Sequence, residues 1–188
     1  MIRRRISDRH GGPGALPAMS IGVVVSATLV VTGASAATSR DANLLEERVI
    51  AACIHRAARG HGWLEKTLWG LRDQEAGWIG AAIRNANGSY DLGPLQINSW
   101  WVPRLAVLLE RSPGDVSRWL RSDACFNAEA ARWIFLSSLS GTHDYWKAVG
   151  LYHSPTPSRQ SRYAGQVSVR LRERFGREIF DRAATSRH

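Results

Sequence analysis

Apolar residues recur at every third or fourth position over much of the chain, which is the spacing of one buried face of an α-helix. In the first such stretch Asp41 stands where a helix cap is expected, and Gly60 and Gly62 stand where the helix should end. The apolar face of this predicted helix consists of Leu45, Val49, Ile50, Cys53, Ile54 and Ala57. The pattern therefore predicts a helix that starts at Asp41 and stops before Gly60.

The helical pattern continues through most of the remaining sequence. One face of a second predicted helix consists of Leu64, Leu68 and Leu71. Glu75 lies one further turn along this helix, near its end. Later helices are predicted around residues 102–109, 125–139, 145–152 and 161–175. Two short segments that contain proline are predicted to separate these helices, namely Pro113-Gly114 and residues 155–157.

The stretch from residue 85 to residue 93 breaks the pattern. It is dense in turn-forming residues, and Asn87-Gly88 is a strong signal for a β-hairpin. A short, irregular β segment is therefore expected among the helices. The predicted fold class is α+β, mostly α, with one small β lobe.

The N-terminal residues have the composition of a secretory signal. A cluster of arginines precedes a short apolar run at residues 21–31, and Ala34-Ser35-Ala36 fits the small-residue pattern at which a signal peptidase cuts. The run is shorter than the roughly 20 residues that a membrane span needs. We interpret residues 1–36 as a cleaved signal that directs the protein to the periplasm. The alternative is an uncleaved signal that anchors the protein in the membrane.

The remaining length suits one domain, because a chain of 188 residues can bury a single sizeable core. We place this domain at residues 37–176 and expect residues 177–188 to be a frayed tail. No stable membrane span is expected once the signal has been removed.

The chain is strongly basic, with a formal net charge of +9, and almost all of its positive charge comes from arginine. A basic surface favours polyanionic partners such as nucleic acid or an anionic cell-wall polymer. Removing residues 1–36 takes away four Arg and one Asp and leaves a charge of +6. Export argues against nucleic acid as the partner.

The two cysteines, Cys53 and Cys125, lack the C-x-x-C spacing and nearby histidine pair of a zinc site. In an exported protein the simplest interpretation is one structural disulfide, and two buried free thiols are the alternative. None of the histidines is paired at a metal-ligand spacing, so no metal is expected. The sequence also lacks a nucleophile elbow and a phosphate-binding loop.

Glu75 is the candidate for acid catalysis. A carboxylic acid beside an apolar wall keeps its proton near neutral pH and can protonate a glycosidic oxygen. Trp69 and Trp78 are close to Glu75 in the sequence and are expected to supply such a wall. The ordinary alternative is that Glu75 is a solvated charge at the end of a helix.

The residues that follow the β segment are suited to bind a sugar. Gly93 would let the backbone come close to a ligand, and Gln96 and Asn98 offer donors and acceptors for hydroxyl and acetamido groups. Trp100-Trp101 could be a sugar platform or part of the core. Each signal is weak alone, but their order along the chain is specific.

This order resembles that of the bacterial lytic transglycosylases with a lysozyme-like domain, in particular the small exported ones associated with type III and type IV secretion, conjugation and pilus systems. The resemblance spans about residues 50–170. It is carried by Cys53, Glu75-Ala76, residues 85–99, Cys125-Phe126-Asn127, residues 148–153 and residues 163–167. Three positions depart from the family pattern. Ala76 replaces a Ser, His153 replaces an Asn, and Pro94-Leu95 replace Leu-Met.

The resemblance implies a lysozyme-like helical fold with a groove beside a small β lobe. It implies that Glu75 is the general acid and later the general base, and that Gln96 and Asn98 line the floor of the groove. It also implies that Tyr152 lies close to the acid and that Tyr163 shapes the wall, although both could serve packing alone. The substrate would be the glycan strand of peptidoglycan, and no cofactor would be needed.

Two other functions stay open at this point. A lysozyme-type hydrolase would use Asp91 as a second carboxylate, whereas the resemblance to the transglycosylases implies that Asp91 holds the β turn. A cell-wall binding or assembly protein with little activity is the other alternative, because Ala76 and His153 are departures next to the expected site.

Overall fold

The computed structural model describes residues 32–180. Most of the predicted signal and the last residues of the predicted tail lie outside this range. The helices are α1 (Thr32–Ala58), α2 (Gly62–Glu75), α3 (Val102–Leu109), α4 (Pro113–Ser122), α5 (Ala124–Thr142), α6 (Tyr145–His153) and α7 (Pro157–Phe175), with short 3-10 turns at η1 (Ser99–Trp101) and η2 (Arg177–Phe180). The strands are β1 (Ala82–Arg84), β2 (Tyr90–Leu92) and β3 (Ile97–Asn98). The mostly helical α+β class is confirmed.

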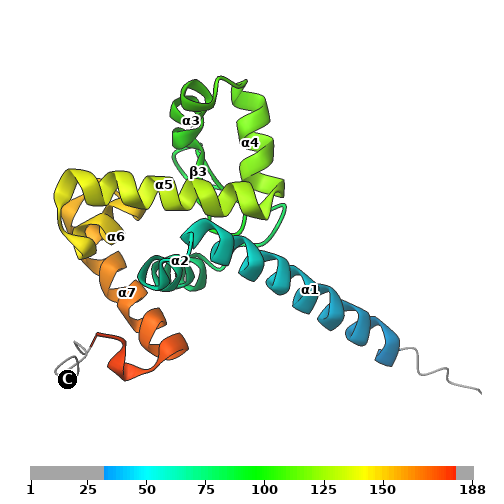
Figure 1. Cartoon of the computed structure of the whole chain (residues 1–188). Helices are drawn as coiled ribbons and strands as arrows, with labels where there is room; N and C mark the ends of the chain where they lie inside the picture. Colours follow the sequence, from blue (N-terminus) through cyan, green and yellow to red (C-terminus); the bar gives the residue numbers. More distant parts are fainter. Residues whose placement is uncertain (1–31, 181–188) are drawn as a thin grey trace, which may run out of the picture.

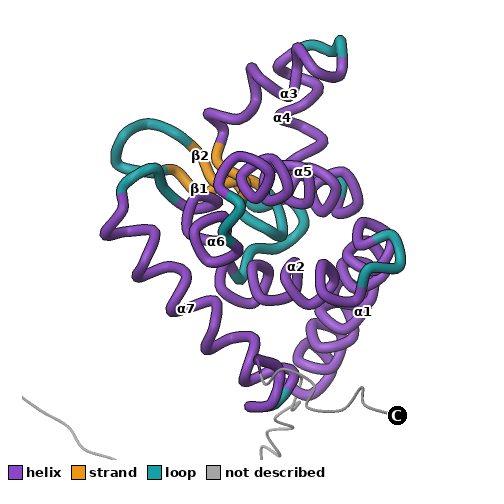
Figure 2. The backbone as a smooth tube through the Cα atoms, turned by 60° about the vertical axis from the view of Figure 1, so that its left-hand side comes forward, coloured by secondary structure: helices purple, strands orange, loops and turns teal. Residues whose placement is uncertain are grey.

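Helix α5 runs through the middle of the molecule (Figure 1). It packs against α1 and α6, while α7 packs against α2 and α6. The pair α3 and α4 projects to one side, and the strands lie beside α5 (Figure 2). A continuous core joins these elements, and its largest fully buried side chains include Phe135, Ile50, Ile54, Leu64 and Leu68.

The first helix is longer than predicted. It begins at Thr32, so Asp41 is an exposed residue inside α1 and does not cap it. The residues before Asp41 are mainly Ala, Ser and Thr, and no proline stops the helix there. Leu45 and Val49 are exposed, at 63% and 42%, because this half of α1 extends beyond the bundle (Figure 1). The rest of the predicted apolar face is buried, namely Ile50, Cys53, Ile54 and Ala57.

Helix α4 was missed, because Pro113 was interpreted only as a separator. Pro113 instead occupies the first turn of α4, where its missing N–H costs nothing. Ser112 caps the helix, and its Oγ accepts a hydrogen bond from the Asp115 N–H at 3.1 Å. Val116 and Leu120 then face the core. Residues 177–180, predicted as part of a frayed tail, form η2, which packs against α6 through Phe180 and Trp146 at 5.4 Å between ring centroids.

The predicted β segment is an antiparallel sheet in the order β1-β2-β3. Asn85 and Ser89 close the turn between β1 and β2, with the Asn85 N–H donating to the Ser89 carbonyl at 2.8 Å. Gly88 has a φ of +83°, which residues with a side chain rarely adopt. Asp91 pairs with Ile83 in β1 and with Asn98 in β3. The Asn-Gly hairpin prediction is therefore confirmed.

Within the described residues no helix is both long and apolar enough to cross a membrane. The two cysteines form a disulfide that joins α1 to the start of α5, with 4.6 Å between the Cα atoms of Cys53 and Cys125. This bond closes a loop of 72 residues. The loop contains α2, the sheet, α3 and α4. The disulfide therefore links the two ends of the segment that contains Glu75 and the sheet.

The first prediction concerns this disulfide. Replacing both Cys53 and Cys125 with Ala should lower the free energy of unfolding by about 4 kcal/mol, because the unfolded chain regains the freedom of a long loop. Urea denaturation of the variant and the wild type measures the difference. Non-reduced peptide mapping of protein recovered from the periplasm checks the pairing itself. Two alkylatable thiols there, or equal stabilities, would contradict the prediction.

Candidate active site

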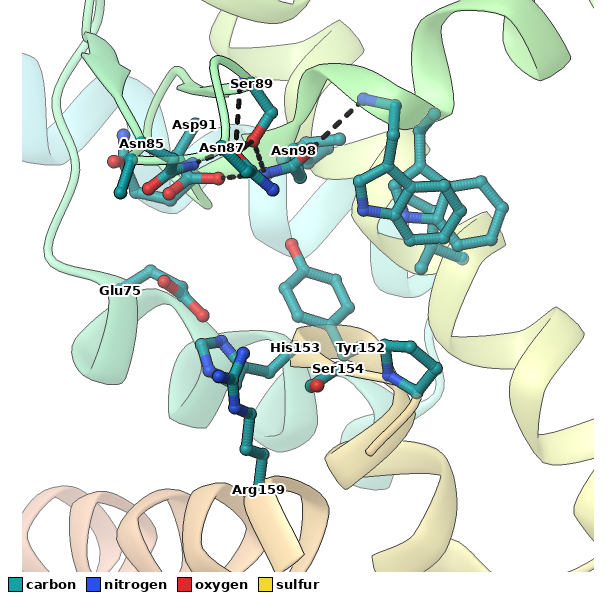
Figure 3. Close-up of a pocket in the computed structure, with 17 residues that line it drawn as sticks. Glu75, Asn85, Asn87, Ser89, Asp91, Asn98, Tyr152, His153, Ser154 and Arg159 are labelled. Atoms are coloured by element: carbon teal, nitrogen blue, oxygen red, sulfur yellow. Dashed lines mark hydrogen bonds between the residues drawn. The ribbon is translucent and has the colours of Figure 1, made fainter. Parts of the chain in front are cut away.

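A polar cleft of about 470 Å³ lies between the end of α2, the sheet, the end of α6 and the first turn of α7 (Figure 3). Its lining residues are Glu75, Asn85, Ala86, Asn87, Ser89, Asp91, Gln96, Ile97, Asn98, Trp100, Trp101, Ile134, Tyr152, His153, Ser154, Pro155 and Arg159. Most of the predicted site residues are therefore brought together here. Gly93 and Tyr163 are the two that do not line this cleft.

Glu75 is the last residue of α2. The next residue, Ala76, takes a left-handed conformation with φ of 49°, and its N–H donates to the Arg72 carbonyl at 2.8 Å. The helix therefore ends abruptly at the edge of the cleft, and the half-buried Glu75 side chain points into it (Figure 3). The Tyr163 hydroxyl donates a hydrogen bond to Glu75 Oε1 at 2.5 Å.

The surroundings of Glu75 favour its protonated form. Its pKa is raised from 4.5 to about 7, mainly by burial and also by the negative charge of Asp91, while the hydrogen bond from Tyr163 acts in the opposite direction. A carboxyl group with such a pKa still carries a proton in a large share of molecules at neutral pH. Glu75 can therefore donate a proton under conditions in which an ordinary glutamate is ionised.

The apolar surroundings of the cleft do not come from the two predicted tryptophans. The guanidinium carbon of Arg174 lies over the ring of Trp69, 3.9 Å from the ring centroid. Trp78 is about half exposed. Neither lines the cleft. The apolar part of the lining instead includes Ile97, Trp100, Trp101, Ile134 and Tyr152. Neighbourhood in the sequence was misleading, because successive residues on and after a helix point in different directions.

Trp100 and Trp101 stack on each other with 4.1 Å between ring centroids. Trp101 is buried against Trp133, whereas Trp100 is 55% exposed at the mouth of the cleft. The pair thus serves both interpretations given by the sequence: Trp101 belongs to the core, and Trp100 offers an exposed aromatic face.

One wall of the cleft is a row of polar side chains on the sheet (Figure 3). The Asn98 amide donates to Ser89 Oγ at 2.9 Å and to Asp91 Oδ1 at 2.8 Å. The Asn98 side-chain oxygen accepts from the Trp100 N–H at 3.1 Å and begins η1. The Asp91 carboxylate is therefore bonded to the neighbouring strand β3 while it faces the cleft, and the turn between β1 and β2 is closed by Asn85, Asn87 and Ser89.

Gln96 and Gly93 lie where the chain turns from β2 to β3. The Gln96 amide donates to the Gly93 carbonyl at 2.7 Å, and Gln96 has a positive φ of 46°. Gly93, with φ of +70°, is buried, and a Cβ there would collide with the Leu120 carbonyl and with Asn127. Its lack of a side chain therefore serves close packing against α4 and α5 rather than an approach to a ligand.

Asn127 holds this turn in place, a role that its position in the Cys125-Phe126-Asn127 stretch alone does not predict. It is fully buried in α5. Its amide donates to the carbonyls of Leu92 and Leu120 at 2.8 Å each, and its oxygen accepts from the Leu95 N–H at 2.9 Å. A buried asparagine in a predicted helix, where a polar residue requires partners, is the signal that could have revealed it.

The two tyrosines have different positions. Tyr152 lines the cleft, but its hydroxyl donates to the Leu95 carbonyl at 2.8 Å, so this hydroxyl is committed to holding the turn. Tyr163 lies behind Glu75 and bonds to it, and its ring stacks on His153 at 4.7 Å with 1° between the planes. Burial raises the pKa of both phenols well above the ordinary value, so both stay protonated donors.

His153 forms part of the opposite wall, near Glu75 (Figure 3). Its ring is exposed on one side and covered by Tyr163 on the other. Partial burial and the nearby charge of Arg159 lower its pKa, although Asp91 acts in the opposite direction. The neutral imidazole is therefore favoured. The departure from Asn at this position places a flat ring that supports the tyrosine bonded to Glu75.

The chain is similar to the invasion protein IagB of Salmonella typhimurium, in both strain SL1344 and strain LT2, with 30% identity over 116 residues. The similarity covers 61% of this chain and 64% of IagB, so the chain spans just under two thirds of the length of that relative. No protein-family model matches the chain.

The second prediction tests the causes of the raised pKa of Glu75. Tyr163→Phe keeps the ring stacked on His153 but removes the hydrogen bond that stabilises the carboxylate, so the pKa should rise above about 7. Asp91→Asn removes a nearby negative charge, so the pKa should fall. A ¹³C NMR titration of the labelled carboxyl group measures both. Unchanged values, or shifts of the same sign, would contradict this account.

Proposed function

We propose that the protein is a peptidoglycan lytic transglycosylase. It would cleave the β-1,4 bond between N-acetylmuramic acid (MurNAc) and N-acetylglucosamine (GlcNAc) and leave a 1,6-anhydro-MurNAc end. The observation that carries the proposal is Glu75, a carboxyl group with a pKa near 7 that faces a polar cleft lined by amides and aromatic rings. The resemblance of residues 50–170 to this enzyme family supports it.

The reaction needs one acid. Glu75 protonates the glycosidic oxygen as that bond breaks, and positive charge develops on the anomeric carbon of MurNAc, where the sugar's own N-acetyl group can stabilise it. The Glu75 carboxylate then removes the proton from the C6 hydroxyl of the same sugar, and the C6 oxygen closes on the anomeric carbon. This hydroxyl is tethered, so its effective concentration exceeds that of a competing water molecule.

The hydrogen bond from Tyr163 suits both steps. It is compatible with the protonated acid, since the second oxygen of Glu75 remains able to donate into the cleft. It also stabilises the carboxylate that forms when the proton has left. The neutral amides of Asn85, Asn87 and Gln96 line the cleft and are suited to bind hydroxyl and acetamido groups.

The hydrolase is the second candidate, because Asp91 lines the same cleft and its charge affects the pKa of Glu75. A hydrolase with this pair would use Asp91 as nucleophile or as base for water. Against this role, the Asp91 carboxylate accepts a hydrogen bond from the Asn98 amide, and Asp91 belongs to the middle strand of the sheet. We therefore favour the reaction that uses Glu75 alone.

A cell-wall binding or assembly protein with little activity is the third alternative. The departures at Ala76 and His153 leave the acid intact, since Glu75 receives its hydrogen bond from Tyr163, and His153 stacks on that same ring. The site therefore retains the acid, a donor that holds it and a polar cleft. These features favour an enzyme.

We further propose that the protein acts in the periplasm, where it would open the cell wall locally for a type III or type IV secretion, conjugation or pilus apparatus. A signal-like segment at residues 1–36 and the disulfide between Cys53 and Cys125 support export. The resemblance of residues 50–170 to the small exported enzymes associated with such systems supports a link to such a machine.

The third prediction concerns the acid. Glu75→Gln should lower the rate of peptidoglycan cleavage by at least about 10²–10⁴-fold, because an amide cannot donate the proton. In the wild type the rate should fall as pH rises through about 7, as Glu75 loses its proton. Turbidity loss of purified sacculi, followed from pH 5 to pH 9, measures both effects.

A stability measurement provides the control for Glu75→Gln. The folded pKa of Glu75 is raised from 4.5 to about 7, so its contribution to stability is complete below pH 4.5 and is lost as pH rises through 7. The variant has no such loss and should be at least as stable as the wild type at pH 8. A stable Gln variant with near-native turnover would refute the assignment of the acid.

The fourth prediction distinguishes the lyase from the hydrolase. Digestion of purified glycan strands should release products with 1,6-anhydro-MurNAc ends, which are lighter by one water than hydrolytic products. Mass spectrometry of the soluble fragments measures this difference. Mainly reducing ends, together with a large loss of rate in Asp91→Asn, would favour the hydrolase instead.

A further inference from the structure

A second, smaller cavity of about 180 Å³ opens beside the acid. It is lined by His153, Arg159, Arg162, Tyr163 and Gln166. His153 and Arg159 also line the main cleft, so the two cavities adjoin at these residues. Figure 3 shows Arg159 reaching from α7 to His153, on the side of the cleft where Glu75 lies. We call this cavity the side pocket.

The side pocket is positively charged. No Asp or Glu lines it, and within residues 32–180 neither Arg159 nor Arg162 forms an ion pair or a side-chain hydrogen bond. Other arginines of the same helix differ, since Arg170 pairs with Glu173 and Arg174 with Asp73. Two unpaired guanidinium groups at one cavity have the chemistry of a site for an anion.

The charge of the side pocket contrasts with that of the main cleft. Apart from Glu75, Asp91 and Arg159, the cleft is lined by side chains without a formal charge, with His153 held mainly neutral. Such a lining suits the hydroxyl and acetamido groups of a glycan. A glycan of GlcNAc alone would therefore leave both arginines without a partner. A substrate with a carboxylate beside the scissile bond would satisfy them.

MurNAc carries such a group, because its O3 bears a lactyl arm. The arm ends in a free carboxylate in strands without peptide, and in the intact wall it is extended by a stem peptide with carboxylates of its own. The side pocket has less than half the volume of the main cleft, 180 Å³ against 470 Å³. This size suits the end of a substituent better than a second strand.

We propose that the side pocket binds a carboxylate on the lactyl arm of MurNAc and thereby places MurNAc, rather than GlcNAc, next to Glu75. This inference rests on the proposed function and adds the feature of the substrate that sets its orientation. The two sources of the carboxylate are the lactyl group itself and the stem peptide. Arg162 is the informative residue, because it lines the side pocket but not the main cleft.

The placement has a consequence for the reaction. Only the sugar whose anomeric carbon lies beside Glu75 can form the 1,6-anhydro ring, and its C6 hydroxyl must face the same carboxylate. Tyr163 belongs to the side pocket and also donates to Glu75. A carboxylate held between Arg159 and Arg162 would therefore orient the reacting sugar through its O3 substituent, at the opposite side of the ring from C6.

Binding to the inactive Glu75→Gln protein tests the inference apart from catalysis. The probes are GlcNAc-MurNAc with a free lactyl carboxylate, GlcNAc-MurNAc-tripeptide and chitobiose, which has no carboxylate. Calorimetry should show that at least one MurNAc probe binds more tightly than chitobiose. Adding Arg162→Gln should weaken that probe about tenfold or more, since a hydrogen bond to a charged group is lost, and should not weaken chitobiose in proportion.

The pattern of losses identifies the source of the carboxylate. Weakening of both MurNAc probes points to the lactyl group or its immediate extension, and weakening of the tripeptide probe alone points to the stem peptide. The matched control is Arg170→Gln, which removes the same charge from the same helix outside both cavities. It should leave all three affinities unchanged.

Two results would overturn the inference. One is equal affinity for chitobiose and both MurNAc probes, and the other is an equal effect of Arg162→Gln and Arg170→Gln. The proposed function is judged separately, by the cleavage of sacculi by the wild type. An active enzyme whose binding ignores the carboxylate would retain the function and lose the inference. If the protein binds the carboxylate but does not cleave sacculi, the pocket's binding role is retained and the proposed function is lost.

Discussion

The geometry of the cleft depends on the hydrogen bonds that the buried side chain of Asn127 forms with the backbone. Its amide forms hydrogen bonds with backbone groups of Leu92, Leu95 and Leu120, which lie in β2, in the turn between β2 and β3, and in α4. Leaving a buried backbone group without a partner costs about 1–3 kcal/mol, so these bonds act together to hold one arrangement. The absent side chain of Gly93 lets the turn come close enough to make them.

The position of the acid follows from this anchor. The turn held by Asn127 presents the Leu95 carbonyl to the Tyr152 hydroxyl, which ties α6 to the sheet. Two residues before Asn127, the disulfide from Cys125 ties the start of α5 to α1. The remaining wall is α7, whose Tyr163 bonds directly to Glu75. Directional bonds therefore join α6 to the sheet and α7 to α2, and burial of Glu75 between these elements raises its pKa.

The sequence was informative where the cause is local. Helical spacing located α2, α3 and α6 closely, and Asn87-Gly88 located the hairpin, because short-range sterics determine both. Prediction from the sequence failed at Pro113, because a proline can either separate two helices or occupy the first turn of a helix. Here Pro113 begins α4. The sequence also could not supply tertiary pairings, since Tyr163 lies 88 residues from Glu75. Resemblance brought Tyr163 to attention, but neither its bond to the acid nor the side pocket follows from periodicity.

The electrostatics of the cleft explain why two carboxyl groups in one site need not share one reaction. Asp91 lies on the sheet and accepts a hydrogen bond from the Asn98 amide, whereas Glu75 accepts a hydrogen bond from Tyr163 and is half-buried, which raises its pKa. The negative charge of Asp91 opposes ionisation of Glu75, which in the proposed reaction would help the acid to keep its proton until the glycosidic oxygen accepts it. Asp91 would also stabilise positive charge developing in the cleft without forming a bond to the sugar. A second carboxylate can thus raise the pKa of the acid through its negative charge alone. Its presence in the cleft therefore does not by itself indicate a nucleophile.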